Sequence, residues 1–151
     1  MSRRNARIVA MQALFQFDMG QPLANDMSEA EVRETALMMA ADSGKDGEPT
    51  KLSEADLKFA RFLVDGVLDN KAAIDEMITA VSKNWKLSRM ASIDRCVLRM
   101  AVFELKFAPH ESAAPVGTVI DEAVRIAKGF GTDNSGKFVN GVLASVIGDK
   151  I

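Results

Sequence analysis

The chain has 151 residues, 48% of them hydrophobic and 26% charged, with a formal net charge of −2. A chain of this length and composition can bury a core of its own, which excludes disordered and collagen-like proteins. One cysteine, Cys96, and one histidine, His110, are too few for an intrachain disulfide or a zinc site of Cys and His ligands.

The amino-terminal part of the chain predicts two helices. Apolar residues recur at helical spacing over residues 3–18, and Gly20 ends this helix. A second helix is expected over residues 29–41, because Ser28 followed by Glu31 matches the capping box that starts a helix.

A polar, glycine-containing loop at residues 42–49 separates these helices from the middle of the chain. A third helix is expected to begin after Ser53, as its cap, and to run to about Asp69. Asn70 marks a break, and the apolar period then predicts a fourth helix that reaches Val81.

The carboxy-terminal half predicts three more helices. The first, capped by Ser92, covers residues 93–107 and is apolar nearly all round, so we expect it to be central and buried.

The sixth helix is expected to carry Pro115 in its first turn and to end at Gly129 and Gly131. The seventh begins at a cap within residues 133–135. No strand pattern of useful length appears, so the sequence predicts an all-α fold of about seven helices.

The charges are unevenly distributed along the chain. Residues 1–17 carry three arginines and no acidic residue, whereas residues 18–56 carry ten acidic against three basic side chains, a net charge of −7. The remaining residues have a net charge of +2. The chain therefore has a basic amino-terminal end, which is suited to binding an anionic partner.

Neither a catalytic site nor a membrane segment is indicated. His110 follows a proline between two predicted helices and is interpreted as an exposed loop residue, while Cys96 lies in the most apolar helix and is interpreted as a buried thiol. We expect a protein that is not an enzyme and binds neither a cofactor nor a metal. Without a signal peptide or an apolar run of roughly 20 residues, we expect a cytoplasmic location and no membrane contact.

Arg3, Arg4 and Arg7 occupy an unusual position on the first helix. At 100° per residue they fall within roughly the same sector as the apolar stripe, and they lie where the helix dipole is positive, which disfavours cations. Phosphate groups of a nucleic acid would explain such a placement. A solvated basic chain end explains it equally well, and these residues alone do not decide between the two.

A second group of candidates surrounds the break between the last two helices, namely Arg125, Lys128, Phe130, Asn134, Lys137 and Phe138. Aromatic rings beside cations suit single-stranded RNA, whose bases stack on rings while its backbone meets the charges. Phe138 also has the spacing of a core residue, whereas Phe130, between two glycines, is expected in the loop.

Several segments resemble the NusB family of transcription antitermination factors. They are Ser2-Arg-Arg-Asn-Ala-Arg7, Ile93-Asp-Arg-Cys-Val-Leu-Arg99, Ala127-Lys-Gly-Phe-Gly131 and Ser135-Gly-Lys-Phe-Val-Asn-Gly-Val-Leu143. They follow the family in order and spacing over almost the whole chain, and the weakest part is roughly residues 18–55.

The resemblance implies two small packed helical bundles within one domain, approximately residues 1–69 and 70–151. It also implies a non-catalytic adaptor that binds boxA, a short single-stranded sequence of ribosomal RNA leader transcripts. Its partner would be the ribosomal small-subunit protein NusE, and the complex would act on RNA polymerase to suppress premature termination.

The resemblance also assigns roles to individual residues. The residues implied to contact RNA are Arg3, Arg4, Arg7, Phe130, Asn134 and Phe138. Phe15 and Asp94 fall toward the partner surface. Relatives often carry an acidic residue at the position of Asn134 and an aromatic hydroxyl at that of Phe15, so both positions depart from the family pattern.

A second interpretation remains open. The arginines could meet an acidic protein partner or another copy of this chain, which would make the protein an interaction module and a possible homodimer. The two interpretations are separated by salt: if the arginines contact RNA phosphates, the affinity of the protein for RNA falls steeply as the salt concentration rises.

Overall fold

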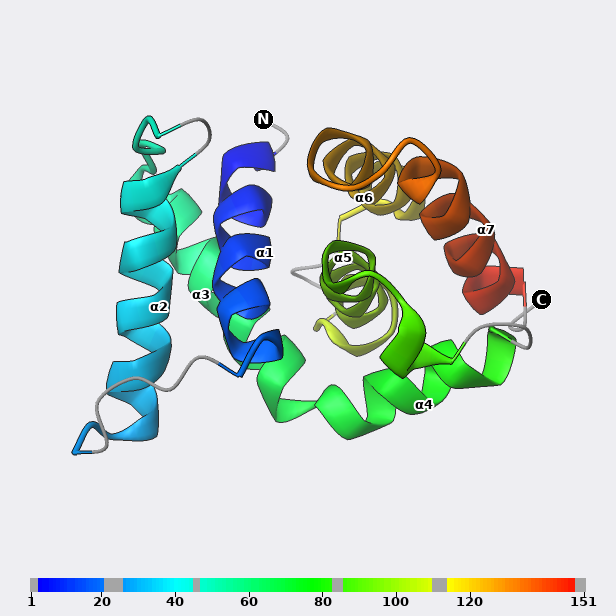
Figure 1. Cartoon of the computed structure of the whole chain (residues 1–151), viewed down its shortest axis with the longest axis horizontal. Helices are drawn as coiled ribbons and strands as arrows, with labels where there is room; N and C mark the ends of the chain where they lie inside the picture. Colours follow the sequence, from blue (N-terminus) through cyan, green and yellow to red (C-terminus); the bar gives the residue numbers. More distant parts are fainter. Residues whose placement is uncertain (1–2, 21–25, 45–46, 83–85, 110–113, 149–151) are drawn as a thin grey trace. The chain divides into compact units, whose positions relative to one another are not determined.

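The computed structural model describes residues 3–20, 26–44, 47–82, 86–109 and 114–148. Within these ranges the chain forms seven α-helices and no β-strand (Figure 1), which confirms the all-α prediction. The helices are α1 (Arg4–Asp18), α2 (Glu29–Ser43), α3 (Glu54–Asp69), α4 (Lys71–Val81), α5 (Ser92–Val102), α6 (Val116–Phe130) and α7 (Ser135–Gly148). None of the helices described is long and apolar enough to cross a membrane.

The helices belong to two compact units, Met1–Asp65 and Gly66–Ile151. The boundary lies inside α3, so the first unit holds α1, α2 and most of α3, and the second holds the end of α3 and the other helices.

In the first unit α1 packs against α2. The buried apolar side chains of α1 are Ala6, Val9, Ala10, Met11, Ala13 and Leu14. Two glutamines of α1 extend the packing, because Gln12 donates from Nε2 to the Gly44 carbonyl at 3.0 Å and Gln16 donates to the Ala36 carbonyl at 3.2 Å. These bonds fix the register of α1 on α2.

In the second unit α5 is the central helix and contacts α4, α6 and α7. Every residue from Cys96 to Val102 is buried, which confirms the expectation drawn from its continuous apolar pattern. The thiol of Cys96 is buried as predicted. This helix therefore provides the core around which α6 and α7 are placed.

Two of the predicted caps are confirmed and one is wrong. Ser28 and Glu31 form the reciprocal capping box of α2, and Ser53 Oγ accepts from the Asp56 amide at 3.1 Å at the start of α3. Ser92, in contrast, is the first residue of α5 and Ala91 occupies the cap position.

The start of α5 is fixed by a longer-range interaction. Arg95 donates from Nη1 to the carbonyls of Leu87 and Met90 at 2.9 and 3.0 Å, and so holds the short turn η1 (Leu87–Arg89) that precedes the helix. A side chain within the helix thus orders the chain before it.

Three helix boundaries also differ from the predictions. The helix expected over residues 93–107 is α-helical only to Val102 and continues as the π-helical segment η2 (Phe103–Phe107), where the Ala108 amide donates to the Phe103 carbonyl. Pro115 is the N-cap of α6 rather than part of its first turn. Gly129 lies within α6, and Gly131 alone ends it.

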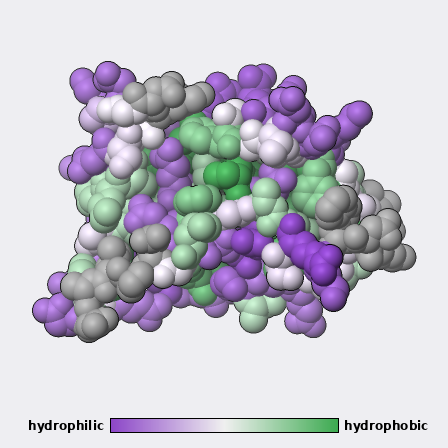
Figure 2. Space-filling view, viewed as in Figure 1, coloured by the Kyte–Doolittle hydropathy of each residue, from purple (hydrophilic) through white to green (hydrophobic). Residues whose placement is uncertain are grey.

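The surface carries few large apolar side chains. Figure 2 shows hydrophilic and hydrophobic residues side by side on one face. Among the described residues, the exposed large hydrophobic side chains are Met19, Met38, Met39 and Val116.

Candidate nucleic-acid interface

The start of α1 presents two exposed arginines. Arg3 precedes the helix with a left-handed backbone, φ 56°, and its carbonyl accepts from the Arg7 amide at 3.1 Å. Arg3 and Arg4 are exposed, and the first turn of α1 has no acidic residue. The positive end of the helix dipole therefore lies beside basic side chains, an arrangement that favours an anion.

An aromatic ring of α3 holds two of these arginines. The guanidinium carbon of Arg3 lies 4.3 Å from the centre of the Phe59 ring, and that of Arg7 lies 5.3 Å from it. Both distances are within the range of cation–π attraction. Phe59 is 7% exposed and its ring stacks on that of Phe62, with centroids 6.1 Å apart. A buried aromatic ring therefore supports both guanidinium groups.

The three arginines are not equivalent. Arg7 is only 3% exposed, so its charge is buried beside Phe59, while Arg3 and Arg4 remain open to solvent. The prediction that this group prolongs the apolar face of the helix agrees with the positions of Arg3 and Arg7. Phe59 was not a candidate on sequence grounds, because its apolar character at helical spacing shows nothing beyond a core residue.

The turn between α6 and α7, which carries the second group of candidates, is closed by backbone and serine hydrogen bonds. The Gly131 amide donates to the Ala127 carbonyl at 2.8 Å, and the Thr132 amide donates to Ser135 Oγ at 2.9 Å. A Cβ at Gly131 would lie 2.4 Å from Ser135 Oγ and 2.8 Å from the Ala127 oxygen, so the turn closes only on glycine. Both helix ends are thereby fixed in this unit.

Each predicted residue of this turn is at least partly accessible. Lys128, Asn134 and Lys137 are exposed, and Phe130 and Phe138 are half-buried. Phe138 is thus not fully enclosed in the core. Phe130 is the last residue of α6 and not a loop residue as expected, because the helix continues through Gly129.

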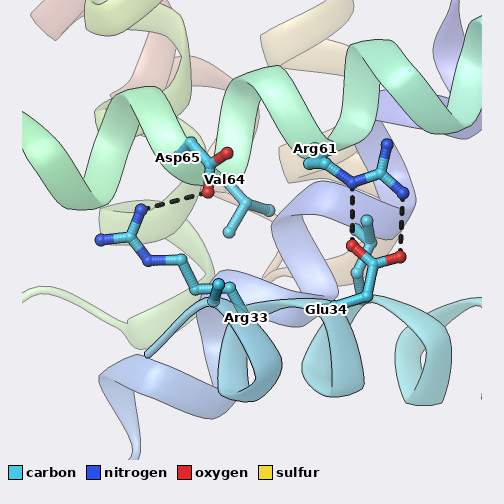
Figure 3. A pocket seen from close by; sticks show the side chains of 7 residues that line it. Arg33, Glu34, Arg61, Val64 and Asp65 are labelled. Atoms are coloured by element: carbon cyan, nitrogen blue, oxygen red, sulfur yellow. Dashed lines mark hydrogen bonds and ion pairs between the residues drawn. The ribbon is translucent and has the colours of Figure 1, made fainter. Parts of the chain in front are cut away.

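A pocket between α2 and α3 offers no comparable site. It has a volume of about 140 Å³ and is lined by Ala30, Arg33, Glu34, Leu37, Arg61, Val64 and Asp65. In Figure 3 its charged groups face one another: Arg61 binds both carboxylate oxygens of Glu34 at 2.8 Å. Arg33 donates to Asp65 at 3.1 Å. The volume is below the roughly 300 Å³ typical of small-molecule pockets, so we interpret it as an ion-paired contact between two helices.

The bidentate pair changes the acidity of its carboxyl group. The hydrogen bonds from Arg61 hold the pKa of Glu34 below its ordinary value, and Glu34 in turn raises the pKa of Arg61. Both side chains are about two-fifths exposed, so the pair is screened by water and contributes modestly.

The described residues contain no group of three or more His, Cys, Asp or Glu side chains that could hold a metal ion. His110, interpreted above as a loop residue, lies outside the described residues.

The model of the NusB family matches residues 4–148. The chain belongs to the NusB family. The recognition made from its motifs is thereby confirmed, and the match includes the segment around residues 18–55 where the motifs are weakest.

Individual members of the NusB family are similar over nearly their whole length. The transcription antitermination protein NusB of Bacillus licheniformis is 42% identical, and the alignment covers 99% of this chain and 98% of that protein. The T. maritima NusB structure is 34% identical with a TM-score of 0.77, covering 97% of this chain and 91% of that one. A chain of a crystal structure of the antitermination factors NusB and NusE with double-stranded RNA is 25% identical, with a TM-score of 0.72 and coverage of 98% and 97%.

The two residues assigned to a partner surface by their place in the NusB motifs differ in accessibility. Phe15 of α1 is half-buried. Asp94, in the first turn of α5, is 8% exposed, and its Oδ1 has no hydrogen-bond partner among the residues described. A direct partner contact of Asp94 therefore requires the partner to reach a nearly covered carboxylate, and both assignments stay predictions.

Proposed function

We propose that this chain is a non-catalytic RNA-binding adaptor of transcription antitermination. It binds single-stranded boxA-type RNA of ribosomal RNA leader transcripts together with NusE, within the antitermination complex of RNA polymerase. The observation that carries the proposal is the exposed Arg3 guanidinium, seated on Phe59 at the positive end of α1.

The start of α1 is suited to a phosphate. The first amide groups of a helix have no partner within the helix, and with the helix dipole they favour an anion. Arg3 and Arg4 add two exposed charges at this end, and Phe59 restricts the freedom that Arg3 would otherwise lose on binding. The contact with Phe59 distinguishes Arg3 from a freely solvated chain end.

The α6–α7 turn supplies what a single strand needs besides charge. Two half-buried rings, Phe130 and Phe138, are close in the chain to the exposed cations Lys128 and Lys137. Unstacked bases gain from aromatic rings and the backbone gains from nearby cations, whereas a duplex keeps its bases stacked on one another. This combination favours single-stranded RNA as the ligand.

The related NusB chain solved with NusE and double-stranded RNA supports both partner classes for this chain. RNA and NusE are therefore tested together. A single-stranded boxA-type RNA is titrated with the full chain alone and with the chain plus NusE, and a duplex of the same sequence serves as the control. The free protein is sized in parallel.

We expect the single strand to bind more tightly than the duplex and NusE to strengthen its binding. An equal affinity for both RNA forms would contradict single-strand recognition. No salt-dependent RNA binding with or without NusE would overturn the proposed function, and a homodimer found by sizing in that case would favour the interaction-module reading.

A further inference from the structure

Gly136, in the first turn of α7, makes room for the side chain of Lys128. A Cβ placed on Gly136 would lie 2.5 Å from Lys128 Cγ, 3.0 Å from its Cδ and 3.5 Å from Cγ1 of Val124. Gly136 is buried although its neighbour Lys137 is exposed. The methylene chain of Lys128 therefore lies directly on the α7 backbone at a position without a side chain.

This contact limits where the charge of Lys128 can be. The ammonium is two bonds beyond Cδ, and Lys128 is exposed, so the side chain buries its stem on α7 and keeps its charged end in water beside the first turn. The first turn of α7 has no acidic residue, and Lys137 lies within it. Asp133, two residues before α7, is an exposed acidic residue close to this turn in the chain.

The backbone on both sides of the contact is fixed. Gly131 and Ser135 close the turn that joins the helices, and Ser135 itself is 1% exposed. A Cβ at position 136 would overlap the Lys128 stem at Cγ, so that stem would have to leave its place on α7. The displacement would carry the ammonium away from the start of α7.

We propose that Gly136 is a positioning residue for RNA binding: its bare backbone seats the Lys128 stem and directs the Lys128 ammonium to a phosphate at the start of α7. This inference rests on the proposed RNA-binding function. It assigns to Gly136 an indirect role, since glycine itself offers no side chain to the RNA.

Gly141 provides a matched control within the same helix. It is exposed, and a Cβ there would have nothing within 4 Å. Alanine at Gly141, in the interior of α7, raises its helix propensity at least as much as alanine at Gly136, in the first turn. A difference between Gly136→Ala and Gly141→Ala therefore reports the overlap with Lys128 and not the loss of glycine.

The experiment measures the affinity of the full chain, with NusE, for a single-stranded boxA-type RNA over a range of salt concentrations. The single variants are Gly136→Ala, Gly141→Ala and Lys128→Ala. A double variant combines Gly136→Ala with Lys128→Ala. We expect Gly136→Ala to bind about fivefold more weakly, on the scale of one displaced charged contact. We also expect a salt slope smaller by up to about 0.7.

Gly141→Ala should stay within about twofold of the unmodified chain. The double variant should bind like Lys128→Ala, because no stem remains to be displaced. Equal losses from Gly136→Ala with and without Lys128 would assign Gly136 to helix packing and overturn the inference. Unmodified affinity in either Gly136→Ala or Lys128→Ala would overturn it as well.

Thermal unfolding of each variant separates folding from positioning. If Gly136→Ala alone does not fold, the comparison of Lys128→Ala with the unmodified chain and with the double variant still decides the matter. RNA binding by the unmodified chain and by Gly141→Ala, combined with no effect of Lys128→Ala, would refute this inference and leave the proposed function standing. Absence of RNA binding by the unmodified chain would refute both.

Discussion

The guanidinium of Arg3 lies over the ring of Phe59, 4.3 Å from its centre, and so joins the residue before the first helix to the third. Arg7 lies 5.3 Å from the same ring centre but is buried. One ring therefore supports one exposed and one enclosed cation. The exposed charge is held in place before any ligand arrives, which reduces the entropy lost on binding.

Phe59→Leu removes the ring and keeps an apolar side chain. We expect RNA affinity to fall by about two- to fivefold, because a cation–π contact of roughly 0.5–1 kcal/mol no longer restricts Arg3. The free energy of unfolding should fall by about 1 kcal/mol, the usual size of such a core change.

The variant Arg3→Ala provides the control for Phe59→Leu. If the ring acts through Arg3, adding Phe59→Leu to Arg3→Ala should cause no further loss of RNA affinity. Full and independent losses in the double variant would show that Phe59 affects binding by another route.

Arg3 is the one non-glycine residue of the described chain with a positive φ, 56°. Such a backbone costs roughly 1–2 kcal/mol for a residue with a Cβ, and glycine relieves that cost while its own flexibility when unfolded offsets part of the gain. We expect Arg3→Gly to leave the free energy of unfolding within about 1 kcal/mol and to weaken RNA binding. The change is measured by urea unfolding and RNA titration.

Arg4→Gly is the matched change inside the helix, where glycine costs roughly 0.5–1 kcal/mol. The two variants should differ in stability in favour of Arg3→Gly. A larger destabilisation by Arg3→Gly than by Arg4→Gly would show that the left-handed backbone at Arg3 is not under strain.

Local signals in the sequence predicted the helices well. The apolar period and the cap signals together located all seven, and the capping box of Ser28 and Glu31 depends only on residues three apart. The failures arose where a distant group decides the outcome. Arg95 holds the turn before α5 through the Leu87 and Met90 carbonyls, and the helix begins at Ser92 rather than after it. Such a bond has no counterpart in the local pattern.

The candidate interface was predicted in part for the same reason. Charge placement pointed to Arg3, Arg4 and Arg7, but only the packing of α3 shows that Arg7 is enclosed. The contribution of Phe59 depends on a contact between the first and third helices, and that of Gly136 on a contact between α6 and α7. The apolar period along a single helix predicts neither of these contacts between helices.

Asn134 is exposed, and its carbonyl accepts from the Phe138 amide at the start of α7. Asn134→Asp places a negative charge where the proposal expects phosphate, so we expect RNA affinity at low salt to fall by about two- to fivefold. Stability should hardly change, because Asp and Asn are similar helix caps. The measurement is an RNA titration at low and at high salt.

Asn140→Asp adds the same charge to an exposed position further along α7 and should have the smaller effect. An unchanged affinity in Asn134→Asp at low salt would mean that no phosphate approaches the start of α7.

The Glu34–Arg61 pair makes stability depend on pH. The pKa of Glu34 is lower in the folded protein than its ordinary value of 4.5. Glu34 therefore contributes stability at pH values above 4.5, and this contribution is lost as the pH falls through the pKa of the folded state. We expect Glu34→Gln to lower the free energy of unfolding at pH 7 by about 0.5 kcal/mol, discounted for exposure. The difference from the unmodified chain should shrink below about pH 4.

Chemical unfolding at several pH values measures this, with Glu76→Gln, a change of an exposed glutamate in α4, as the control. A destabilisation by Glu34→Gln that is equal at pH 7 and at pH 3 would exclude the ion pair as its cause.

The dependence of RNA affinity on salt tests the central claim most directly. The variant Arg3→Gln with Arg4→Gln removes the two exposed charges and leaves the buried Arg7 in place. If both contact phosphate, the slope of log affinity against log salt for a single-stranded boxA-type RNA should become smaller by about 1.4, or 0.7 for each contact. An unchanged slope and affinity in a variant that unfolds like the unmodified chain would contradict an RNA interface at the start of α1.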